Sequence, residues 1–221
     1  KAIGMPLAKL ATKIMLGVSL DAQNVSENRE SNYYAVKEAV FPFSKFMGVD
    51  TILGPEMKST GEVMGIGKTF SEAFIKSQLA AGIRFPTKIP GKLAFISVRD
   101  HDKPAAVDLA RKLQMLGFDL VATKGTAEYI GNRGIKVETV KKVTEGRPHI
   151  VDRIKNGQIS FILNTVEERK SAIKDSRSIR TSALSESVTT YTTLAGAKAA
   201  VDGLSSLAAS KVEVYDLKSL H

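Results

Sequence analysis

The stretch Gly91-Lys-Leu-Ala-Phe-Ile-Ser-Val-Arg-Asp100 decides the fold that the sequence predicts. Residues 92–98 are almost continuously apolar, which is typical of a strand that is buried on both faces. A polar turn follows, and Pro104 then suits the first position of a helix, where its missing N–H is harmless. Gly117 is placed to end that helix. Apolar residues recur between them with helical spacing, at Ala106, Leu109, Ala110, Leu113 and Leu116.

The same alternation continues to the end of the chain. Further short strands are expected at residues 118–122, 135–140, 159–163 and 188–191. Helices are expected toward Gly131 and at residues 150–155, 170–184 and 194–209. Strands that alternate with helices predict an α/β fold, in which helices cover both faces of a parallel sheet. Ligands of such sheets bind beyond the carboxyl ends of the strands.

The part before this alternation has a different pattern. Two prolines and a glycine within residues 84–91 predict an extended linker. Helices are expected at residues 6–16 and 70–81, with strands at 33–43 and 56–65. These elements make a thin core for their length. We therefore divide the chain into residues 1–85, a linker at 86–91 and a domain at 92–221, and interpret the first part as a piece of a larger domain.

Composition excludes several classes of protein. The chain has no cysteine, which rules out disulfides and cysteine chemistry and agrees with a cytoplasmic location. Residues 92–221 carry +6 of the formal net charge of +9, but no basic run exceeds two residues, so we expect no nucleic acid partner. Lys9 and Lys13 interrupt the first apolar stretch, which therefore does not resemble a signal peptide. No stretch reaches the roughly 20 apolar residues of a membrane span.

Polar residues follow four of the predicted strands. Gly125 lets a backbone approach an anion closely, and the helix that starts near Thr126 turns its positive end toward the same place. Lysines add charge, and an asparagine can bond a base or a sugar. The sequence therefore predicts a pocket for a phosphate-bearing small molecule, lined by Lys103, Thr123, Gly125, Thr126, Lys142 and Asn164. The alternative for Thr123 is an ordinary helix cap, and for the lysines a solvated surface.

Catalytic and metal-binding residues are not expected. His149 follows Pro148 and is the most tempting candidate, but no serine or cysteine nucleophile pattern accompanies it. Its alternative role is that of a residue at a helix N-terminus. His101, His149 and His221 lack the spacing of metal ligands, so no metal site is predicted.

Four blocks of sequence resemble the C-terminal end of the carbamoyl-phosphate synthase large subunit of bacteria. They are residues 34–43, 54–65, 144–150 and 152–157. The resemblance implies that residues 1–85 end the second ATP-grasp unit, whose ATP- and metal-binding residues would precede Lys1. It also implies that residues 92–221 are the allosteric domain, a three-layer, methylglyoxal-synthase-like fold. No cofactor is expected in this fragment, whereas the parent enzyme uses ATP with Mg or Mn and K.

The resemblance also assigns roles to residues. In the family, UMP inhibits and IMP activates at one overlapping site, and its residues match Lys103, Thr123, Thr126, Lys142 and Asn164. The family's ornithine site matches Glu38 and Thr192. The sequence departs from the family at Val166 and Thr190, which replace a threonine and a tyrosine, so the identity of the effector stays open.

The resemblance implies a regulatory fragment with particular partners. The parent makes carbamoyl phosphate for pyrimidine and arginine biosynthesis and pairs with a glutaminase small subunit. An exposed strand edge in the first part also favours a homo-oligomer. Two alternatives remain. One is a phosphate-eliminating lyase like methylglyoxal synthase, although the segment 145–149 lacks an acid for the role of base. The other is a purely structural oligomerisation domain.

Overall fold

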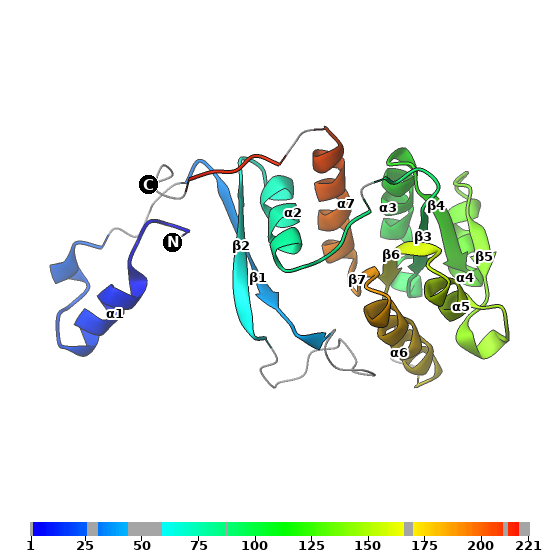
Figure 1. Ribbon diagram of the computed structural model, residues 1–221, viewed down its shortest axis with the longest axis horizontal. Coiled ribbons are helices and arrows are strands. Elements are labelled where there is room, and N and C mark those ends of the chain that lie inside the picture. The colour runs from blue at the N-terminus through cyan, green and yellow to red at the C-terminus, as the bar shows by residue number, and fades with distance from the viewer. Residues whose placement is uncertain are drawn as a thin grey trace.

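A computed structural model describes residues 2–25, 31–43, 59–86, 88–165, 170–209 and 212–216, without the side chains of residues 170–174. Its centre is a five-stranded sheet in which every neighbouring pair is parallel, in the order β5-β4-β3-β6-β7 (Figure 1). The strands are β3 (Leu93–Ser97), β4 (Asp119–Thr123), β5 (Glu138–Val140), β6 (Ile159–Asn164) and β7 (Thr189–Tyr191). The prediction of a parallel α/β sheet is therefore confirmed.

Helices cover both faces of this sheet. One layer consists of α3 (Lys103–Met115), α4 (Lys124–Gly131) and α7 (Leu194–Ala209), and the other of α5 (Ile150–Lys155) and α6 (Lys170–Ser185). Successive residues of β3 pack against opposite helix layers. Ala94 and Ile96 pack with the first layer, whereas Phe95 packs with the second. The domain is thus a three-layer sandwich, and the inner strands β3 and β6 are mainly apolar because both of their faces are buried.

The ends of α3 explain the prolines and glycines around it. The helix begins at Lys103, so Pro104 takes its second position rather than the first that we expected. The shift is harmless because the first four N–H groups of a helix have no acceptor within it. At the other end Gly117 has φ +97°, and the N–H of Phe118 donates to the Leu113 carbonyl at 3.0 Å. Gly117 therefore ends the helix, as predicted.

The first part of the chain is built around a two-stranded antiparallel sheet. It pairs β1 (Tyr34–Val40) with β2 (Gly61–Gly67), and α2 (Phe70–Ala80) lies against it (Figure 1). Glycine is required where the helix meets the sheet, since a Cβ at Gly65 would lie 2.0 Å from the carbonyl oxygen of Ala73.

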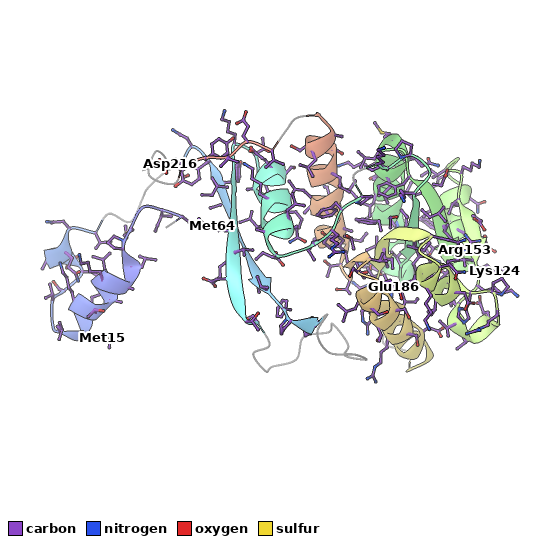
Figure 2. All side chains as sticks on the ribbon, viewed as in Figure 1. Met15, Met64, Lys124, Arg153, Glu186 and Asp216 are labelled. Atoms are coloured by element: carbon purple, nitrogen blue, oxygen red, sulfur yellow. The ribbon has the colours of Figure 1, made fainter. Side chains whose placement is uncertain are left out.

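The first helix, α1 (Leu7–Met15), lies apart from this sheet in Figure 1. None of its residues is buried, and Met15 at its tip is 86% exposed (Figure 2). The described residues thus give α1 no core to pack against, in agreement with the thin core inferred from the sequence.

The two parts of the chain meet at α2 and α7. In Figure 1, α2 lies between the two-stranded sheet and α7. A Cβ on Gly203 of α7 would lie 2.9 Å from the Cβ of Ile75 on α2, so the two helices are in close contact. The sequence pattern placed α7 in the second domain but gave no sign that it also packs on the first part.

A short segment near the C-terminus returns to the first part. The hydroxyl of Tyr215 bonds the Glu72 carboxylate on α2 at 3.1 Å, and the Lys76 ammonium lies 2.6 Å from the same carboxylate. Burial raises the pKa of Glu72, but hydrogen bonds from Lys76, the Lys68 N–H and Tyr215 outweigh it and lower the pKa. None of the described helices has the length and apolar character to cross a membrane.

Candidate functional site

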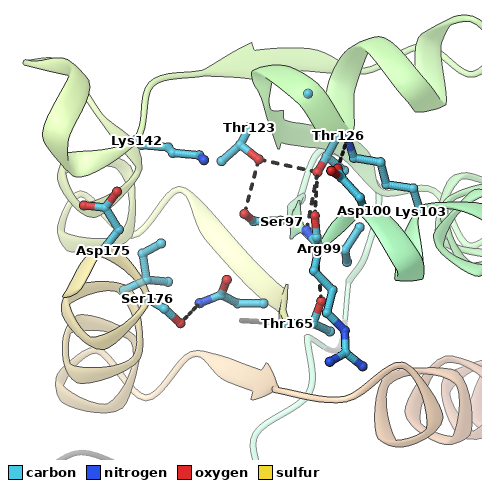
Figure 3. Close-up of a pocket in the computed structure, with 14 residues that line it drawn as sticks. Ser97, Arg99, Asp100, Lys103, Thr123, Thr126, Lys142, Thr165, Asp175 and Ser176 are labelled. Atoms are coloured by element: carbon cyan, nitrogen blue, oxygen red, sulfur yellow. Dashed lines mark hydrogen bonds and ion pairs between the residues drawn. The ribbon is translucent and has the colours of Figure 1, made fainter. Parts of the chain in front are cut away.

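One pocket lies at the carboxyl ends of β3, β4 and β6, where the sequence predicted it. It has a volume of about 260 Å³ and lies between the strand ends and α6 (Figure 3). Every residue predicted from the strand ends lines it. These residues are Lys103, Thr123, Gly125, Thr126, Lys142 and Asn164. We refer to this cavity as the strand-end pocket.

Two buried threonines form the floor of the strand-end pocket. Thr123 is the N-cap residue of α4, but its side chain makes no capping hydrogen bond. Its hydroxyl instead lies 3.2 Å from the Ser97 hydroxyl and donates to the Thr126 hydroxyl at 3.5 Å. The alternative that the Thr123 side chain caps the helix is therefore wrong, although the residue occupies the N-cap position, and its hydroxyl accepts from none of the backbone N–H groups at the start of α4.

Lys103 brings positive charge to the same end of the pocket. Its ammonium group lies 2.6 Å from the carboxylate of Asp100, and only 18% of its side chain is exposed. A Cβ at Gly125 would lie 3.3 Å from that ammonium group, so glycine leaves room for Lys103 beside the start of α4. Lys142 extends toward Thr123 from the other side of the pocket (Figure 3). The two lysines thus flank the threonine hydroxyls.

The opposite wall comes from α6 and was missed by the sequence analysis. Asn164 donates to the Ser176 hydroxyl at 2.7 Å, and the Asp175 carboxylate accepts from Thr144 at 3.0 Å. The second carboxylate oxygen of Asp175 is buried and has no hydrogen-bond partner among the described residues. Asp175 and Ser176 precede the inward-facing Ile179 by four and three residues, so helical spacing already placed them on the inner face.

His149 lies outside the strand-end pocket and has a structural role. It is the N-cap of α5, where its Nδ1 accepts from the Asp152 N–H at 3.4 Å and its own N–H donates to the Asp152 carboxylate at 2.9 Å. The alternative of a residue at a helix N-terminus is therefore confirmed for His149. Val166, where the chain departs from the family pattern, falls outside the described residues.

A second cavity lies between the two parts of the chain. This junction pocket has a volume of about 330 Å³, and its walls come from β1, the end of α2, α6 and β7. Glu38 and Thr190 line it, together with Arg84 and Arg180. Thr192, the other residue predicted for an ornithine site, is exposed and is not among the lining residues. Burial raises the pKa of Glu38, and a hydrogen bond from Gln78 partly offsets that rise.

Comparison with known families covers four of the five strands of the large sheet, β4 to β7. The family described as MGS-like domain matches residues 105–192, which run from α3 to the end of β7. The chain contains an MGS-like domain. Among solved structures, methylglyoxal synthase from Elizabethkingia anophelis aligns with 51% of this chain and 79% of its own, at 18% identity and a TM-score of 0.39.

Homologues of the whole chain are carbamoyl phosphate synthase large chains. The chain is 56% identical over 221 residues to the large chain of Ralstonia nicotianae and 52% identical over 221 residues to that of Pasteurella multocida. Both alignments cover 100% of this chain and 20% of the relative. The chain therefore spans about a fifth of the length of these relatives and matches their C-terminal end, MGS-like domain included.

Proposed function

We propose that this chain is the regulatory C-terminal part of a glutamine-hydrolysing carbamoyl phosphate synthase large chain, and that the strand-end pocket binds a nucleoside monophosphate of the UMP or IMP type. The observation that carries the proposal is the meeting of six residues, predicted from separate strand ends, in one pocket beside a helix N-terminus. In this role the effector would change the activity of the parent enzyme because it binds two conformations of the protein with unequal affinity.

The threonine end of the pocket suits a phosphate group. Hydroxyls of Thr123 and Thr126 can donate to phosphate oxygens, and the start of α4 offers backbone N–H groups with a positive dipole end. Lys103 and Lys142 supply the two charges that a phosphate monoester dianion needs. Phosphate would compete with Asp100 for Lys103. The ion pair between Lys103 and Asp100 is weak because the Asp100 side chain is exposed.

The α6 end of the pocket suits the nucleoside. A ribose offers two hydroxyl donors, and Asp175 has a buried carboxylate oxygen, unpartnered among the described residues, that could accept from one of them. Leaving such an oxygen buried costs about 1–3 kcal/mol, which a hydroxyl donor would recover. Asn164 presents an amide at the same wall, where it can bond a base or a sugar.

The junction pocket suits an amino acid with a basic side chain, and we assign ornithine to it. Glu38 provides a carboxylate for an ammonium group, while Arg84 and Arg180 provide guanidinium groups on other walls. Residues 1–85 would then be the end of the second ATP-grasp unit of the parent. That enzyme, paired with its glutaminase small subunit, would make carbamoyl phosphate from bicarbonate, glutamine-derived ammonia and two ATP.

Calorimetric titration of the 221-residue chain tests the nucleotide proposal. UMP and IMP should each bind, and each should displace the other because they share one pocket. Inorganic phosphate should bind more weakly at the same place, and uridine without phosphate should bind weakly or not at all. A correctly folded chain that takes up neither nucleotide would exclude this function.

A phosphate-eliminating lyase is the alternative. The buried oxygen of Asp175 favours it, because a base within reach of the substrate is what the sequence pattern lacked. Turnover of dihydroxyacetone phosphate that disappears in Asp175→Asn would establish the lyase. We favour regulation because the homologues over the whole chain are synthase large chains rather than lyases.

A further inference from the structure

Three polar side chains form a continuous chain of hydrogen bonds between the two parts of the protein. The Tyr191 hydroxyl on β7 donates to Oε1 of Gln78 on α2 at 2.9 Å. The Gln78 side chain in turn bonds the carboxylate of Glu38 on β1. Gln78 is only 5% exposed, so its amide has little access to water. The chain of bonds therefore runs from the large sheet, through α2, to a residue that lines the junction pocket.

The chemistry of the three groups fixes the direction of these bonds. A glutamine amide has an acceptor oxygen at one end and a donor NH₂ at the other. Because Tyr191 occupies the oxygen, the NH₂ group is the end that faces Glu38, whose ionised carboxylate can only accept. Burial, with the nearby charge of Glu38, raises the pKa of Tyr191, so its hydroxyl keeps the proton that it donates.

We propose that Gln78 is the positioning residue of the junction pocket, oriented by Tyr191, and that it fixes the Glu38 carboxylate as the acceptor for a primary ammonium group of the ligand. The inference deepens the proposed function and rests on it, since the ligand class is that of the junction pocket. Without Tyr191 the amide is free to rotate and present its oxygen to the carboxylate, which would repel it.

The surroundings of Glu38 make such positioning necessary. Glu38 is half-buried, and burial alone favours the neutral acid, which binds an ammonium group poorly. The hydrogen bond from Gln78 opposes that effect. Among the described residues, the hydrogen bond from Gln78 is the interaction that lowers the pKa of Glu38, whereas Arg84 and Arg180 line other walls of the pocket. Unlike these arginines, Gln78 is not among the residues that line the junction pocket; it makes its hydrogen bond to Glu38 from outside the cavity.

Two variants with a matched control test the proposal in the full chain. Gln78→Leu removes the donor to Glu38, and Tyr191→Phe removes only the hydroxyl that orients the amide. Tyr215→Phe is the control, because it removes a phenol hydroxyl that bonds Glu72 on the same helix but not Gln78. The pKa of Glu38 is followed by NMR titration of its labelled carboxyl carbon, and the affinity for L-ornithine by calorimetry.

Both test variants should raise the pKa of Glu38 above its wild-type value and weaken L-ornithine binding about 3- to 10-fold, the effect of losing one hydrogen bond. Tyr215→Phe should change neither quantity. If the pKa rises as expected but the wild type binds no L-ornithine, the positioning role stands and the assigned ligand is wrong. An unchanged pKa in Tyr191→Phe, which should fold even if Gln78→Leu does not, would overturn the positioning role.

Discussion

Replacement of Thr123 by valine separates the two roles that the sequence allowed for this residue. Valine keeps the shape of threonine and replaces only the hydroxyl with a methyl group. In the structure that hydroxyl does not cap α4 but faces Ser97 and Thr126 at the floor of the strand-end pocket. The substitution should therefore impair nucleotide binding far more than folding.

The expected magnitudes follow from the hydrogen bonds involved. A bond from a hydroxyl to a charged phosphate contributes about 1.5–3 kcal/mol, so UMP binding should weaken about 10- to 150-fold. The bonds that Thr123 makes within the protein are long, at 3.2 and 3.5 Å. Their loss should lower the free energy of unfolding by only about 0.5–1 kcal/mol.

Thr69→Val is the matched control. Thr69 is also a helix N-cap residue, but its side chain does accept from the Glu72 N–H, at 3.2 Å. Its substitution should lower the free energy of unfolding by about 1 kcal/mol and leave UMP affinity unchanged. Calorimetry measures the affinities, and urea denaturation measures the stabilities.

Either of two results would refute the reasoning. The wild type could bind UMP and Thr123→Val could bind it equally tightly. In that case the two threonines of the pocket floor do not hold the phosphate. Alternatively, both valine variants could weaken binding to the same extent, in which case the loss reflects general destabilisation rather than a lost contact.

Three further predictions concern single side chains. Gly125→Ala should weaken UMP binding several-fold in calorimetry, because the new Cβ would lie 3.3 Å from the Lys103 ammonium. It should also raise thermal stability slightly, since alanine favours a helix over glycine by about 1 kcal/mol. Gly203→Ala should lower the free energy of unfolding in urea by about 1–3 kcal/mol, because its Cβ would lie 2.9 Å from Ile75 across the contact of α2 and α7. Glu72→Gln should make the free energy of unfolding in urea less dependent on pH in acid. The lowered pKa of the Glu72 carboxyl stabilises the fold above its unfolded pKa of 4.5, and this stabilisation is lost as the pH falls through the folded pKa.

The strands and helices after residue 92 were predictable because local chemistry determines them. The inner strands β3 and β6 are buried on both faces, which makes them mainly apolar, and Gly117 supplies the positive φ that ends α3. The strand-end residues were predictable for a related reason. A parallel sheet brings its carboxyl ends to one edge, so positions far apart in the sequence become neighbours without any knowledge of side-chain contacts.

Other features depend on tertiary packing that no local pattern contains. Gly203 lies in the Ala-rich helix α7, and the sequence of this helix does not indicate that its small residues pack against α2. Thr192 was expected beside Glu38, but β7 ends at Tyr191 and the chain turns into α7. The residues that line the junction pocket therefore stop at Thr190, and Thr192, which follows β7, is exposed.

The helix α6 relates the two pockets physically. Asp175, Ser176 and Ile179 line the strand-end pocket, whereas Arg180, Ala183 and Leu184 line the junction pocket one to two turns further along. Arg180 also donates to Ser176 at 2.5 Å, so a hydrogen bond connects the two walls directly. A ligand that shifts α6 in one pocket must therefore alter the geometry of the other. If both ligands bind as proposed, such coupling is reciprocal, and ornithine should change the affinity for UMP by the same factor by which UMP changes the affinity for ornithine.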